Sequence, residues 1–171
     1  VYRTYCRIRI YMATEKLKFK IELFATHWDK IPTVEILINN DSKFSAEISE
    51  TEDKPKLIEF EHEFEEEKNY NLVLKRGGKT NNQTIVNEKG DILKDQLLHI
   101  KSIEIDEIDI GGLVFEGVYE PSYPEPWATQ QKEAGTELPK TLKNVTQMGH
   151  NGTWTFTFTS PFYMWLLENL Y

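Results

Sequence analysis

Apolar and polar residues alternate along most of this chain, and a period of two is typical of β-strands with one buried face. The first such segment begins at Leu17, after which every second residue up to Ala25 is apolar. Polar or glycine-containing turns separate this segment from the ones that follow. Strands are therefore expected at residues 17–25, 34–38, 44–48, 58–64, 70–74 and 153–159.

A different pattern runs from residue 98 to residue 110. Three apolar pairs occur there, each with a spacing of two: Leu98 and Ile100, Ile103 and Ile105, Ile108 and Ile110. One extra residue separates successive pairs, so the inward-facing parity flips. At helical spacing these six positions would scatter around the axis, which excludes an amphipathic helix. The pattern predicts short strand pieces joined by bulges or tight corners.

Turn residues and prolines mark several connections. The four residues Asn87–Gly90 end in glycine and predict a hairpin, and His150-Asn151-Gly152 gives a second hairpin signal. Four prolines between residues 120 and 140 predict a long, mostly irregular loop, from Glu120 to Pro139.

The last residues predict a helix, because Ser160 suits an N-cap and Pro161 a first turn. About nine or ten strands and few helices in one chain of this length indicate a sandwich or barrel. The predicted fold is all-β, a jelly-roll-like antiparallel β-sandwich with a short C-terminal helix over residues 162–171. Residues 16–171 form its single domain, and residues 1–15 are an N-terminal extension or edge strand.

Charge is unevenly spread over the chain, whose net charge is −8. Residues 1–20 hold six lysines and arginines against one glutamate, a net of +5, which leaves −13 on the rest. An acidic body disfavours nucleic acid as a partner, because phosphate contacts need clustered basic residues. No apolar run is long enough to span a bilayer, so no membrane partner is expected.

The basic segment is interpreted as an edge strand protected by lysines, and docking onto an acidic neighbour is the alternative. Six glutamates between residues 59 and 67 form an acidic face and turn. A weaker hypothesis pairs that face with residues 3–20 of a neighbouring subunit.

Met12-Ala13-Thr14 resembles a natural start, so residues 1–11 are expected to be an upstream reading or an artificial addition. The single cysteine, Cys6, excludes an internal disulfide.

Catalytic chemistry is poorly represented, and no enzyme is predicted. The histidines have no serine or cysteine in a recognised nucleophile motif near them: His27, His62, His99 and His150. His62 has the inward parity of its strand, and His99 has the outward parity of its own.

Four aspartates are candidate calcium ligands, because they lie near turns or strand corners where oxygen ligands can converge on the ion: Asp91, Asp95, Asp106 and Asp109. Solvated carboxylates are the preferred interpretation of these residues. One cysteine and no closely spaced histidine pair disfavour zinc. No cofactor and no metal ligand are predicted, with calcium as the alternative.

The aromatic residues give the most suggestive site. Tyr119, Tyr123 and Trp127 are expected on the proline-rich loop, and Trp28 lies just after the first strand. Exposed aromatic rings stack on sugars, and interfaces are enriched in the same residue types. A subunit contact or packing is preferred to glycan binding. Trp154 and Trp165 are expected in the core.

Three stretches of the chain carry a resemblance to a known family. They read KTNNQTIVNEKGDILKDQLLHIKSIEIDEIDI, GVYEPSYPEPW and NGTWTFTFTSPFYMWLLENLY. They resemble small virion-associated proteins of tailed bacteriophages, above all those of large contractile-tailed phages such as marine cyanophages. That family is similar in fold to calcium-dependent xylan-binding carbohydrate-binding modules. The resemblance extends from Lys16 to Tyr171, and the calcium ligands of those modules are not carried over.

The resemblance implies a non-enzymatic structural protein located in the virion and assembled in the host cytoplasm. Such a protein is a capsid decoration or cement, or a tail, neck or fibre component, and it contacts other virion proteins and further copies of itself. The alternative is a carbohydrate-binding module that recognises host surface glycans through Trp28, Tyr123 and Trp127. A hydrolase is the least favoured interpretation.

Overall fold

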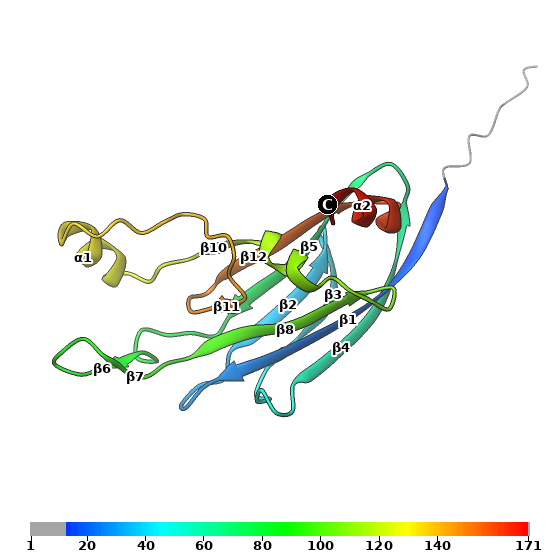
Figure 1. Ribbon diagram of the computed structural model, residues 1–171. Helices are drawn as coiled ribbons and strands as arrows, with labels where there is room; N and C mark the ends of the chain where they lie inside the picture. Colours follow the sequence, from blue (N-terminus) through cyan, green and yellow to red (C-terminus); the bar gives the residue numbers. More distant parts are fainter. Residues whose placement is uncertain (1–12, 171) are drawn as a thin grey trace, which may run out of the picture.

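Two antiparallel sheets pack face to face in the computed structural model, which describes residues 13–170 (Figure 1). The first sheet has the order β11-β8-β1-β4, with β9 also paired to β8, and the second has the order β10-β12-β5-β2-β3. The first comprises β1 (Thr14–Thr26), β4 (Lys56–Glu65), β8 (Leu97–Ile105), β9 (Ile108–Asp109) and β11 (Gln147–Met148). The second comprises β2 (Thr33–Ile38), β3 (Asp41–Glu47), β5 (Asn69–Gly77), β10 (Val118–Pro121) and β12 (Gly152–Thr159). The predicted fold class is confirmed.

Alternating residues of both sheets form the core. In β1 the apolar residues from Leu17 to Leu23 are at most 4% exposed. Phe19 of β1 faces Phe158 of β12 across the sandwich, with ring centroids 6.4 Å apart. Trp154 is fully buried, as predicted. Trp165 is half-buried and packs edge-on against Phe156 at 5.5 Å.

The basic strand β1 lies between β4 and β8, so the described part of the basic segment is not an edge strand. Its lysines face the glutamates of β4 on the outer surface, where Lys16 pairs with Glu61 at 2.9 Å and Lys20 with Glu59 at 3.9 Å. The acidic face of β4 thus has partners within its own chain. Cys6, Met12 and the rest of the expected extension up to residue 12 lie outside the described residues.

The inward-facing parity of the apolar residues changes twice within residues 98–110, and the two changes have separate causes. In the β1–β8 pairing, Glu22 opposes Ser102 while Leu23 opposes Ile100, so Lys101 is the extra residue of a β-bulge. Asp106 and Glu107 then form a two-residue turn with φ of 54° and 66°, and β9 pairs back onto β8. Two positive φ values are typical of the tight turns that suit a twisted hairpin. Both devices match the predicted bulge and corner.

Of the two hairpin predictions, one is confirmed and one is wrong. Residues 87–90 join β6 (Ile85–Val86) to β7 (Ile92–Lys94), and the side chain of Asn87 accepts hydrogen bonds from the N–H groups of Lys89 and Asp91. At residues 149–151, by contrast, the chain crosses between sheets, because β11 pairs with β8 and β12 pairs with β5 and β10. Local turn residues do not distinguish a crossing from a hairpin.

Three helices complete the described part of the chain: the 3₁₀ segment η1 (Gly111–Glu116), α1 (Trp127–Glu133) and α2 (Phe162–Asn169). The predicted irregular loop is therefore wrong over α1. The C-terminal helix is confirmed, but Ser160 does not cap it. Glu15 of β1 instead accepts hydrogen bonds from the Ser160 hydroxyl and the Phe162 N–H, both at 2.7 Å. No helix within residues 13–170 is long and apolar enough to cross a membrane.

Gly117 offers a direct test of the core packing. An added Cβ there would lie 2.2 Å from atoms of the fully buried Trp154 ring. We expect Gly117→Ala to lower the free energy of unfolding by about 1–3 kcal/mol, because the ring must move in a filled core. Urea denaturation measures the change. Gly112→Ala is the control, since its Cβ meets no atom within 4 Å. Equal stability of the two variants would contradict this packing.

Candidate functional site

The four predicted contact residues do not lie together. Tyr119 is in strand β10, not on a loop, and is 2% exposed. It pairs with Trp154 of β12, and its hydroxyl donates a hydrogen bond to the carbonyl of His150. Strand geometry turns the ring into the core, so its prediction as an exposed loop residue is wrong. Trp28, Tyr123 and Trp127 remain at least partly exposed.

These three residues lie at one end of the sandwich. Figure 1 shows the β6–β7 hairpin and α1 extending from this end, with α2 at the opposite end. We call this region the hairpin end and define it as residues 28–30, 78–96 and 121–151. Hydrogen bonds connect its parts, because Trp28 bonds to Gln83 and Asn81 bonds to the carbonyl of Glu125.

Trp28 forms a fixed, half-exposed platform. Its indole N–H donates to the carbonyl of Gln83 at 2.7 Å, and 41% of the residue is exposed. Gln83 is itself fully buried and is held by Asp29 and by the N–H of Lys30. The ammonium group of Lys94 lies 4.7 Å from the indole centroid, within the range of a cation–π contact. One ring face is therefore covered by a cation.

Tyr123, Trp127 and His150 form a second aromatic cluster. The imidazole of His150 lies 5.1 Å from the ring of Tyr123 and 5.3 Å from that of Trp127. The Tyr123 hydroxyl donates to the carbonyl of Pro139 at 2.6 Å and joins the two arms of the segment that carries α1. Burial, aided by the positive charge of Lys79, lowers the pKa of His150, so the ring is neutral at pH 7. Sequence reasoning did not identify His150 as part of this cluster.

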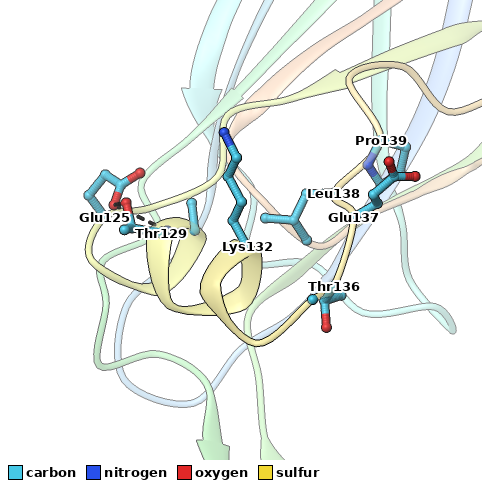
Figure 2. Close-up of a pocket in the computed structure, with 9 residues that line it drawn as sticks. Glu125, Thr129, Lys132, Thr136, Glu137, Leu138 and Pro139 are labelled. Carbon is cyan, nitrogen blue, oxygen red and sulfur yellow. Dashed lines mark hydrogen bonds between the residues drawn. The ribbon is translucent and has the colours of Figure 1, made fainter.

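An open groove of about 840 Å³ lies beside α1. Figure 2 shows Thr129 and Lys132 on α1 at one side of it, with residues 136–139 on the other. Thr129 donates a hydrogen bond to Glu125 at 2.7 Å, and the lining mixes charged, hydroxyl and aliphatic groups. The aromatic cluster is not among the lining residues. No spacing in the sequence indicated this groove.

A buried polar network underlies the hairpin end. The guanidinium of Arg76, 3% exposed, donates to the side chain of Asn151 and to the carbonyl of Gln96, each at 2.7 Å. Asn151 also bonds to both the N–H and the carbonyl of Lys79. The Lys79 ammonium lies 2.7 Å from Asp95. The network therefore ties β5, the residues before β8 and the crossing before β12 to one another.

Burial and hydrogen bonds set the charges in this network. Burial lowers the pKa of Arg76 to about 10, so the group stays cationic at neutral pH. For Asp95, burial acts to raise the pKa, but hydrogen bonds from Lys79, Thr84 and the Gln96 N–H outweigh it and hold the pKa below its usual value. At neutral pH this buried region therefore contains both cations and a carboxylate.

Three of the four aspartates weighed as calcium ligands bond to different partners, and the fourth, Asp106, is exposed in the turn between β8 and β9. Asp95 accepts bonds from Lys79 and Thr84, Asp91 bonds to Asn87, and Asp109 accepts the N–H of Gly111. Within residues 13–170 no group of three or more His, Cys, Asp or Glu side chains is placed to hold a metal. These aspartates do not fit a shared calcium site, and calcium stays the alternative to the prediction of no cofactor.

The other histidines have local, structural surroundings. The outward parity of His99 predicts an exposed side chain, and this prediction is wrong. His99 is half-buried, because its ring stacks on Phe24 at 4.4 Å and bonds to the Thr26 hydroxyl. His62 is also half-buried and lies 3.7 Å from Asp41 of β3. His27 bonds to the backbone carbonyl of Ser49.

Comparisons with known proteins give one distant structural likeness. No protein-family model matches the chain, and no curated protein matches it. One solved structure, described as vCBM60 in complex with galactobiose, superposes with a TM-score of 0.43 and 6% sequence identity. The match covers 81% of this chain and 96% of that chain. The likeness to this carbohydrate-binding module concerns the fold alone.

The Lys79–Asp95 pair generates a prediction for acid stability. Asp95→Asn leaves the 12%-exposed Lys79 side chain without its counter-charge, so we expect a loss of about 1–3 kcal/mol at pH 7. Because the folded pKa of Asp95 lies below its unfolded value of about 3.9, its contribution is present above that pH and is lost as the pH falls further. The stability difference between wild type and variant should therefore shrink from pH 4 toward pH 2.

Urea unfolding from pH 7 to pH 2 measures this difference. Asp91→Asn, in the exposed turn of the hairpin, is the control and should change stability by less than about 0.5 kcal/mol. An Asp95→Asn variant as stable as the control at pH 7 would show that the pair contributes nothing.

Proposed function

We propose that this chain is a non-enzymatic structural protein of a bacteriophage particle, which acts by contacting other virion proteins through its hairpin end. The sequence resemblance over residues 16–171 supports a place in the phage particle, either as a capsid decoration or as a tail, neck or fibre component. The structure supports a contact role through the surface that it exposes.

The exposed hairpin is the observation that carries the proposal. Ile85, Val86, Ile92 and Leu93 are 37%, 53%, 63% and 61% exposed. They lie on a two-stranded ribbon outside both main sheets, and a ribbon of this size is marginally stable on its own in water. Contact with another subunit would remove these aliphatic groups from water and add order to the ribbon.

The aromatic residues at the same end agree with a contact surface. Trp28 and Trp127 are 41% and 36% exposed, and both are held by neighbours within the hairpin end. Tryptophan and tyrosine are enriched among the residues that dominate binding energy at interfaces. Rings that are already fixed lose little conformational freedom on binding.

Glycan binding is the second candidate, and the platform at Trp28 favours it. A fixed indole face with a carboxylate nearby, at Asp29, is the kind of surface on which a sugar ring stacks. The Lys94 ammonium competes for one face of that ring. Glycan stacking there requires the other face or displacement of the lysine.

Recovery of the chain in purified particles tests the structural role. Particles of the encoding phage are banded on a density gradient, washed in high salt and analysed by quantitative mass spectrometry. We expect peptides of this chain in fixed ratio to the major capsid protein. Its absence from washed particles, with the protein present in the infected-cell lysate, would contradict a virion role.

Trp127→Ala separates the two candidate functions. If Trp127 is an interface anchor, the substitution should weaken incorporation into particles by a few kcal/mol and leave sugar binding unchanged. If Trp127 contacts a sugar, the substitution should abolish binding on a glycan array, read with and without calcium. The control is Phe115→Ala, a 45%-exposed aromatic residue in η1, outside the hairpin end. Glycan binding lost only with Trp127→Ala would favour the carbohydrate-binding role.

A further inference from the structure

The β6–β7 ribbon has two free edges. Its strands pair only with each other among residues 13–170, in the register Ile85 to Lys94 and Val86 to Ile92. Free strand edges present unpaired N–H and carbonyl groups, which another strand can pair with. Such a ribbon therefore offers backbone hydrogen bonds as well as apolar side chains to whatever covers it.

The exposed apolar area approaches what one side of a stable dimer needs. Full burial of Val, Ile or Leu at about 25 cal/mol per Å² corresponds to about 100 Å² for each side chain. The four hairpin residues therefore still present about 200 Å², and the two tryptophans add about 150 Å². A standard interface takes about 800 Å² from each partner, of which roughly 450 Å² is apolar.

The net charge of the hairpin favours a second copy of this chain over a strongly charged partner. Residues 79–95 carry three basic and three acidic side chains and are net neutral, whereas the chain as a whole carries −8. Two acidic proteins meet with least repulsion where each is neutral. A contact with a basic partner, guided by electrostatic attraction, would instead use a surface with mainly negative charge. Charge-poor, apolar centres are also typical of homodimer interfaces.

We propose that two copies of this chain associate through their β6–β7 hairpins, in a two-fold symmetric contact centred on Ile92 and Leu93. This inference rests on the proposed role of the hairpin end as a protein contact surface. Symmetry places the same patch on both partners, so one neutral, apolar surface serves both sides of the contact. The ring of Trp28, 4.7 Å from the ammonium group of Lys94 in β7, lies at its border.

Sedimentation velocity on the purified chain, from about 1 to about 200 μM, tests the pairing. We expect a monomer–dimer equilibrium in this range. The double variant Ile92→Lys/Leu93→Lys should raise the dimer dissociation constant at least about 100-fold, because it places four lysines at the contact. Circular dichroism and thermal unfolding check that the variant folds.

The matched control is Leu57→Lys/Met164→Lys, which adds the same charge at residues 50% and 56% exposed on β4 and α2. It should dimerise like the wild type. A wild type that stays monomeric at 200 μM, or a dimer that survives the hairpin variant or is lost in the control, would overturn the proposal. A monomer that is nevertheless recovered in particles would refute the pairing alone and leave the structural role standing.

Discussion

One buried cation organises the end of the sandwich from which the contact surface extends. The guanidinium of Arg76 lies almost entirely out of water and bonds to Asn151 on one side and to the carbonyl of Gln96 on the other. Burying a charge is unfavourable unless such partners are present. Strand β5, the crossing before β12 and the start of β8 are therefore held in one arrangement.

The surface features depend on that arrangement. Lys79 and Asp95 continue the network, and Asp95 also accepts a bond from Thr84 at the base of the hairpin. Gln83, in the same loop, holds the indole of Trp28. A charged interior thus supports an apolar exterior, and the exposed residues are presented by ordered loops, which lowers the entropic cost of binding.

Most of the sandwich was predictable because one sheet face is buried and the other is solvated. The period of two located β1, β4 and β5, and the parity flips located the bulge at Lys101 and the turn at Asp106. The helix cap supplied by Glu15 and the crossing at residues 149–151 were not predictable, because both depend on partners far away in sequence. Periodicity carries no information about such contacts.

The site was predictable only in part. Exposed positions for Trp28 and Trp127 followed from their places outside the strand pattern, while Tyr119 was misplaced because β10 is a four-residue strand within a proline-rich stretch. The hairpin was predicted, but not that its aliphatic side chains stay exposed: isoleucine and leucine in a short strand normally indicate burial. Exposure follows from the placement of the ribbon outside both sheets.

The most direct measurement is a reconstruction of the phage particle by electron cryomicroscopy, at a resolution that traces this chain. The account predicts that the hairpin end faces another protein subunit, with Ile92 and Leu93 buried in the contact. A particle in which the chain is present but its hairpin end projects freely into solvent would contradict the account.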